Sequence, residues 1–142
     1  MQLNPDCVRD ILLYLEEKLT ILDGNKFSKV ELKDIYEAFE NTYSKEDIFY
    51  SVYNLHQIRF IEGRIENVTN QKMFFCEIEN ISWNGHQFLN TVRPKSIWDA
   101  TKTKAKQIGG MSLQTLSTIA VSIMQAVATN PDFIQNIVNT LK

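Results

Sequence analysis

The sequence lacks the features that mark several specialised classes of protein. Its only two cysteines, Cys7 and Cys76, are too few for a disulfide framework, so free thiols in a reducing compartment are expected. The first ten residues carry acidic side chains and no apolar core of the kind that a signal peptide needs. The formal net charge of −2 gives no overall field toward nucleic acid or anionic lipid. We therefore expect a globular protein of the cytoplasm.

Motifs of catalysis and metal binding are also missing. The sequence has no nucleophile elbow, no phosphate-binding glycine loop and no His-Glu-x-x-His pair. Its two histidines, His56 and His86, and its two cysteines lack the short ligand spacing that is typical of zinc sites. We accordingly expect a non-enzymatic protein with no cofactor and no metal, and we infer no small-molecule ligand.

A third absence is local, since no charged residue occurs from Gln107 to Pro131. A transmembrane helix needs about 20 mostly apolar residues, and the segment 112–128 holds seven Ser, Thr and Gln. A helix that lies on a membrane surface carries Lys or Arg on its polar face, and this segment has neither. We expect no membrane contact. A helix without charges is usually covered by other protein.

Helical spacing of apolar residues, together with helix caps, predicts three helices before residue 58. Asn4 caps the first helix. Ser28 and Glu31 have the spacing of a capping box for the second, although a short strand around residues 26–30 competes with that start. Ser44 caps the third helix.

Two strands follow these helices. Residues 59–65 and 73–81 alternate in polarity and are joined by a polar loop, which is typical of a β-hairpin. Ser82 then caps a fourth helix, in which Gly85 permits close approach of a neighbouring backbone.

This order of elements is that of a winged helix-turn-helix. The predicted fold class is α+β and mostly α, with a small antiparallel β-hairpin as the wing and a helical C-terminal extension. We place the winged-helix domain at residues 1–92 and the extension at residues 93–142.

Three stretches carry a resemblance to a known family: LNPDCVRDILLYLEE, YSKEDIFYSVYNLHQIRFIEG and ISWNGHQFLNTVR. They resemble domain of unknown function 2513, a family of uncharacterised bacterial and prophage proteins. The last stretch is usually Leu-Thr-Trp-x-Gly-His-x-Phe-Leu, and here Ile81-Ser82 replaces Leu-Thr while keeping the capping hydroxyl. The resemblance implies a winged-helix-like fold and a bacterial or phage origin. It implies no catalytic residue.

The extension begins with a helix after Pro94, which Gly109-Gly110 ends. Ser112 caps a long uncharged helix, and Asn130-Pro131 starts a last one. Along the uncharged helix, apolar residues recur in steps of three and four, as in a coiled-coil seam. The seam consists of Leu113, Leu116, Ala120, Ile123 and Val127. We expect it to join copies of the chain in a homo-oligomer, with packing inside one chain as the alternative.

Binding to double-stranded DNA is one predicted function. The third helix of a winged helix enters the major groove, and the wing contacts phosphate. The candidates on the third helix are Lys45, Ser51, Asn54 and Gln57, and those on the wing are Arg64 and Lys72. The third helix is poor in cations, however, and phosphate neutralisation supplies much of the affinity for DNA. The alternative is a winged helix that serves as a protein-interaction or assembly module.

A basic segment offers a second set of DNA contacts. Residues 82–106 hold five basic side chains and one acidic one. Lys95, Lys102 and Lys106 fall on one helix face, because they are seven and four residues apart. They form either an anion-binding stripe or a solvated face with a Lys95–Asp99 pair. We expect a DNA-binding regulator, or an interaction module that does not bind DNA.

Overall fold

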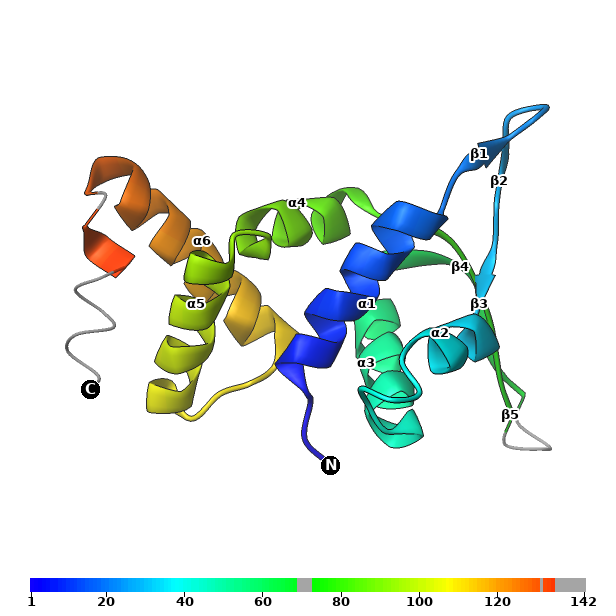
Figure 1. The fold of residues 1–142 in the computed structure, drawn as a ribbon, viewed down its shortest axis with the longest axis horizontal. Helices are drawn as coiled ribbons and strands as arrows, with labels where there is room; N and C mark the ends of the chain where they lie inside the picture. Colours follow the sequence, from blue (N-terminus) through cyan, green and yellow to red (C-terminus); the bar gives the residue numbers. More distant parts are fainter. Residues whose placement is uncertain (69–72, 131, 135–142) are drawn as a thin grey trace.

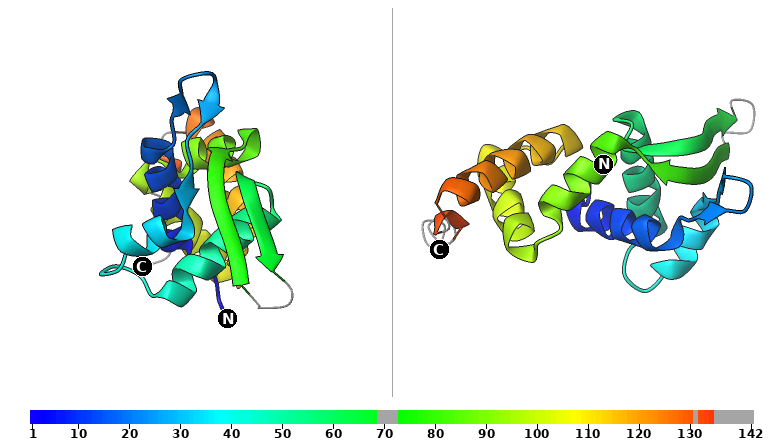
Figure 2. Two further views of the ribbon diagram at one scale, coloured as in Figure 1. Left: turned by 90° about the vertical axis from the view of Figure 1, so that its right-hand side faces the viewer. Right: turned by 90° about the horizontal axis from the view of Figure 1, so that it is seen from above.

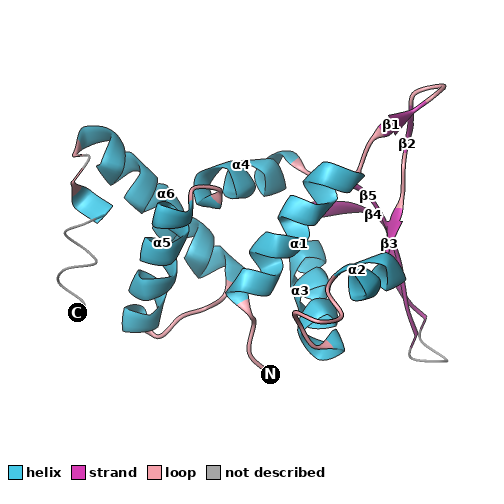
Figure 3. Ribbon diagram, viewed as in Figure 1, coloured by secondary structure: helices cyan, strands magenta, loops and turns pink. Residues whose placement is uncertain are grey.

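The computed structural model describes residues 1–68, 73–130 and 132–134. Its elements follow one another in a simple order (Figure 1). They are α1 Pro5–Lys18, β1 Ile21–Leu22, β2 Lys26–Phe27, β3 Val30–Glu31, α2 Leu32–Ala38, α3 Lys45–Gln57, β4 Ile61–Val68, β5 Met73–Ile81, α4 Trp83–Val92, α5 Lys95–Ile108 and α6 Leu113–Thr129. The fold is α+β and mostly helical with small antiparallel sheets, which confirms the predicted class. The strands gather at one end of the molecule (Figure 3).

Four of the predicted helix caps are present. The Asn4 side chain accepts a hydrogen bond from the N–H of Cys7, and the hydroxyls of Ser44, Ser82 and Ser112 accept from the N–H three residues ahead. Each of these bonds satisfies one of the N–H groups that the first turn of a helix leaves unpaired. Side-chain chemistry at single positions therefore determines where α1, α3, α4 and α6 begin.

The predicted start of α2 is wrong. Val30 pairs with Ile78 in β5, so the backbone at residues 30–31 is extended and the helix begins only at Leu32. The N–H of Glu31 donates to the Asp34 carboxylate at 2.9 Å, while Ser28 accepts from a loop N–H instead. The competing strand wins because β5 offers a partner for its backbone groups.

One antiparallel sheet has the strand order β3-β5-β4, and β4 and β5 form the predicted hairpin. Ile65, Cys76 and Ile78 point into the core, and Phe75 lies on the opposite, exposed face. This arrangement agrees with the alternation in polarity that predicted a strand at residues 73–81. The loop that joins the two strands, with Lys72, lies outside the described residues.

The junction between the sheet and α4 is tightly packed. The N–H of Ser82 donates to the carbonyl oxygen of Phe60 at 2.9 Å, and its hydroxyl donates to the carbonyl oxygen of Arg59 at 2.6 Å. A Cβ on Gly85 would lie 2.2 Å from that Phe60 oxygen. The predicted close approach at Gly85 is therefore confirmed, and the neighbour is the end of the α3–β4 turn.

The helices of the extension share the core of the preceding elements. One cluster of buried side chains extends from Cys7 in α1 to Ile123 in α6 and includes Trp98 in α5. In Figures 1 and 2, α5 and α6 pack beside α4, at the end of the molecule away from the sheet. The two predicted segments, 1–92 and 93–142, thus meet across buried side chains.

The seam predicted on α6 packs inside the single chain, which is the alternative that the sequence left open. Four of its side chains are buried within the single chain and Val127 is half-buried, because α6 packs on α4 and α5. The buried members are Leu113, Leu116, Ala120 and Ile123. The regular spacing marked a covered helix face correctly, and the cover is intramolecular.

Of the last predicted helix, only residues 132–134 are described. Phe133 and Ile134 pack against the core, and residues 135–142 lie outside the described residues. None of the helices that the structure describes has both the length and the apolarity to cross a bilayer.

Candidate functional site

The third helix, α3, has one buried face and one outward face. Ile48, Ser51, Val52 and Leu55 are fully buried. The predicted outward position of Ser51 is therefore wrong. Ser51 lies three residues after Ile48 and four before Leu55, which places it on the inner face. Its side chain is fully buried, so it is not available for a contact with DNA.

The outward face is formed by residues at steps of four, three and four: Glu46, Tyr50, Tyr53 and Gln57. The ring of Tyr53 stacks on Phe49, with ring centroids 6.4 Å apart and an interplanar angle of 19°. All these side chains are partly or fully exposed. The sequence analysis predicted Gln57 on this face and did not predict the two tyrosines, although their spacing from Glu46 and Gln57 places them on the same side of the helix.

The other predicted contacts on α3 make interactions of their own. The Asn54 amide donates to the carbonyl oxygen of Tyr50 at 2.7 Å, so it is held against its own helix. The Lys45 ammonium lies 5.7 Å from the centre of the Tyr36 ring on α2, a cation–π contact. Lys45 therefore sits at the α2 side of α3, off the outward face.

The exposed face of the β4–β5 hairpin carries mainly carboxylates. The Arg64 guanidinium lies 4.9 Å from the centre of the Phe75 ring and 3.9 Å from a Glu66 oxygen. Glu77 pairs with Lys29 at 3.5 Å. Together, α3, β4 and β5 contain two cations against six carboxylates, a balance of −4.

The predicted basic stripe on α5 is largely neutralised within the chain. Lys95 pairs with Asp99 at 2.9 Å, and Lys102 pairs with Asp6 on α1 at 2.8 Å. Partial burial acts to raise the pKa of Asp6, but hydrogen bonds from Lys102 and Trp98 outweigh it and hold that pKa below its usual range. Lys106 is exposed. The predicted Lys95–Asp99 pair is confirmed.

The stripe also lies far from the strands. In Figures 1 and 2, α5 stands at the end of the molecule opposite to β4 and β5. Arg93, just before α5, is used structurally: its guanidinium donates to both carboxylate oxygens of Glu16, at 2.7 and 2.6 Å. These bonds hold the pKa of Glu16 below its usual range. The structure does not bring the stripe and the hairpin together on one surface.

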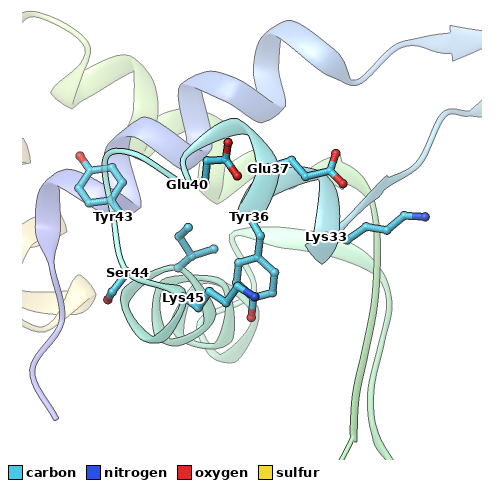
Figure 4. A pocket seen from close by; sticks show the side chains of 8 residues that line it. Lys33, Tyr36, Glu37, Glu40, Tyr43, Ser44 and Lys45 are labelled. Carbon is cyan, nitrogen blue, oxygen red and sulfur yellow. The ribbon is translucent and has the colours of Figure 1, made fainter.

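A pocket of about 370 Å³ opens between α2, the α2–α3 loop and α3 (Figure 4). Tyr36 reaches from α2 toward Lys45, and the Tyr43 hydroxyl donates to Asp10 on α1. The lining holds two lysines and two glutamates, so its formal charge is balanced. The lining combines these four charged side chains with two tyrosine rings and Ile48.

The thiols are inert parts of the core. Burial raises the pKa of the Cys7 thiol to about 11 and that of Cys76 to about 12. A thiol with such a pKa is a poor nucleophile near neutral pH. Within the part of the chain that the structure describes, no group of three or more His, Cys, Asp and Glu comes together as metal ligands.

Comparison with known proteins identifies one family. The family described as a hypothetical protein, domain of unknown function 2513, matches residues 2–112. No curated protein and no solved structure matches the chain.

Proposed function

The chain belongs to the family of domain of unknown function 2513, and we propose that it is a non-enzymatic protein-interaction module. Its contact surface is the outward face of α3 with the exposed face of β4 and β5. Its partner is a protein with a basic contact surface. The origin implied by the family is bacterial or phage, and the site of action is the cytoplasm.

A winged helix-turn-helix is the arrangement that fits the order of elements. The short strand β3 lies between α1 and α2 in the sequence, α3 comes next, and the β4–β5 hairpin follows α3 and pairs with β3 through β5. In such a fold the third helix and the hairpin form the contact surface. This order supports α3 as the centre of the site.

The observation that carries the proposal is the chemistry of that surface. The helix and the two strands that form it contain two cations against six carboxylates, whereas DNA binding draws its sequence-independent affinity from Lys and Arg that neutralise phosphates. Tyr50 and Tyr53 supply instead the amphipathic rings that are enriched at protein–protein contacts. A carboxylate-rich surround steers and orients a basic partner.

DNA binding by a regulator remains the alternative. Exposed Gln57 and Arg64 are its remaining described candidates at this surface, with Lys45 at the α2 side of α3, and α5 with Lys95, Lys102 and Lys106 lies at the other end of the molecule. Fluorescence anisotropy with a random 30-base-pair duplex at low salt decides between the two functions. The proposal expects no binding. Tight binding that weakens with salt along a log–log line would overturn it and would count the neutralised phosphates.

Site-specific photo-crosslinking in the native cells tests the protein partner directly. A benzoylphenylalanine replaces Tyr53 on the outward face of α3, and a matched probe replaces Lys104, which is exposed on α5. We expect a protease-sensitive, nuclease-resistant adduct from position 53 and not from position 104. Adducts that nuclease removes would favour DNA.

Charge reversal provides the second arm of this experiment. Glu62→Lys, on the exposed side of β4, is expected to lower the yield of the position-53 adduct. Glu17→Lys, on the exposed side of α1, changes the net charge equally and is expected to leave the yield unchanged. Equal yields in both variants would contradict a contact with a basic partner.

A further inference from the structure

A short hairpin, β1–β2, projects from the end of the molecule that holds the strands (Figures 1 and 3). Ile21 pairs with Phe27, and Leu22 with Lys26. Three of these four side chains are large, apolar and exposed: Ile21 by 62%, Leu22 by 52% and Phe27 by 47%. A two-stranded hairpin alone is marginally stable in water. Its apolar side chains therefore present a surface suited to burial by another molecule.

A second uncovered surface lies between α4 and α6. Two adjoining cavities, of about 380 and 200 Å³, share Phe60 and Ser117 in their linings. The linings consist of Ile58, Phe60, Asn84, Gln87, Phe88, Thr91, Gln114, Ser117, Thr118 and Val121. These residues include no charged side chain. We call this surface the α4–α6 groove.

Exposed apolar side chains also border the groove. Trp83, which precedes the lining residue Asn84, is 77% exposed, and Val121 in the lining is 43% exposed. Of the eight exposed large hydrophobic residues in the described part of the chain, three lie on the hairpin and two at the groove. Exposed apolar surface is thus concentrated in two separate patches, and one of them is a projection while the other is a hollow.

We propose that the β1–β2 hairpin of one chain seats in the α4–α6 groove of a second copy, and that the contact is reciprocal in a two-fold dimer. The groove holds no charged side chain, so apolar side chains enter it without desolvating an ion, and Ile58, Phe60, Phe88 and Val121 offer them apolar contacts. In Figure 1 both α4 and the hairpin lie along the upper side of the molecule, which suits an isologous contact. Neither α3 nor β4–β5 takes part, so this inference and the proposed function stand or fall separately.

The area available is close to what a stable dimer needs. The exposed fractions of Ile21, Leu22, Phe27, Trp83 and Val121 are 62, 52, 47, 77 and 43%. With roughly 200 Å² for each fully exposed large side chain, these five residues expose about 560 Å² per chain. Two chains then bury about 1,100 Å² through these side chains alone, against about 1,200 Å² for the smallest specific interfaces. The lining of the groove and the hairpin backbone add further area.

Size-exclusion chromatography with light scattering over a range of concentrations tests the dimer. We expect the wild-type chain to run as a dimer, and Leu22→Asp and Val121→Asp each to shift it to lower mass by weakening association at least tenfold. Ile108→Asp is the matched control, because Ile108 is 63% exposed and lies on neither surface. All three positions are exposed, and circular dichroism is expected to show folded variants. A wild-type monomer at every concentration would overturn the proposal.

Mixing the two variants distinguishes the reciprocal contact from other dimers. Leu22→Asp keeps an intact groove and Val121→Asp an intact hairpin, so the mixture retains one of the two contacts and is expected to associate more weakly than the wild-type chain but more strongly than either variant alone. A dimer through paired hairpins would instead leave Val121→Asp fully dimeric, and that result would contradict the groove as the seat. A mixture that associates no more strongly than either variant alone would likewise contradict it.

A disulfide between two copies tests directly whether the hairpin of one lies close to the groove of the other. Leu22→Cys on one chain and Ser117→Cys on the other are expected to cross-link under mild oxidation, while Ile108→Cys with Ser117→Cys does not. The native thiols do not interfere, because Cys7 and Cys76 are buried. Equal cross-linking in both mixtures would contradict a hairpin seated in the groove of a second copy. A chain that does not dimerise but floats with lipid vesicles, and does so only with an intact hairpin, would also overturn the second copy as the occupant.

Discussion

Gly85→Ala measures how rigid the junction between the sheet and α4 is. The added Cβ would lie 2.2 Å from the carbonyl oxygen of Phe60 and 2.8 Å from Cγ2 of Ile81. Both residues are buried, and the Phe60 oxygen also accepts the Ser82 N–H, so moving it disturbs the cap of α4. Overpacking costs about 1–3 kcal/mol and a weakened cap about 1 kcal/mol, against a gain of about 1 kcal/mol from Ala in a helix. We expect a net loss of about 2 kcal/mol.

Urea unfolding followed by circular dichroism measures this loss. With an m value of about 2 kcal/mol per molar urea, the midpoint is expected to fall by about 1 M. Gly110→Ala is the control, because the nearest atoms to its Cβ would belong to the side chain of Thr115, with the methyl group at 3.3 Å. It is expected to change stability by less than about 0.5 kcal/mol. Equal midpoints for the two variants would refute the steric argument.

Three further predictions concern side chains that link helices or fill the core. Asp6→Ala removes the acceptor of the buried Trp98 indole N–H, and calorimetry is expected to show a loss of about 1–2 kcal/mol, with Asp6→Asn milder because it keeps an acceptor. Arg93→Met is expected to cost less than about 1 kcal/mol, because the Arg93 and Glu16 side chains are 42% and 36% exposed. Because the pKa of Glu16 is lowered in the folded state, the difference in stability between wild type and Arg93→Met is expected above about pH 4.5 and is expected to disappear as the pH falls below that value. Urea unfolding at several pH values measures this difference. Both cysteine thiols are expected to resist Ellman's reagent at pH 8 until the protein is unfolded, because burial raises their pKa values to about 11 and about 12; rapid reaction of the native protein would contradict their burial.

Local chemistry was the part of the fold that the sequence made predictable. Asn4, Ser44, Ser82 and Ser112 each begin a helix because one side-chain oxygen accepts a hydrogen bond from the N–H three residues ahead, a contact that is local in the sequence. The close approach at Gly85 was also readable, since a glycine inside a helix needs a packing reason. That the neighbour is the Phe60 carbonyl depends on the tertiary fold and could not be predicted from the sequence.

The errors share a different cause. Periodicity shows which face of a helix is covered, but not whether the cover comes from the same chain, so Leu116 and Ile123 were assigned to a second copy. The start of α2 depended on the pairing of Val30 with Ile78, a contact between residues far apart in sequence. The β1–β2 hairpin has only two residues in each strand, too few for any alternation to be detected. Ser51 is an exception, because its spacing from Ile48 and Leu55 already placed it inside.

The buried face of α6 bears on where this protein can be divided. The family match ends at residue 112, one residue before α6 begins, whereas the hydrophobic core continues to Ile123. A fragment cut at the family boundary would leave the apolar faces of α4 and α5 bare and invite aggregation. The matched region is therefore smaller than the hydrophobic core of the folded chain. A shortened protein made for expression should extend beyond residue 112 and include α6, which covers α4 and α5.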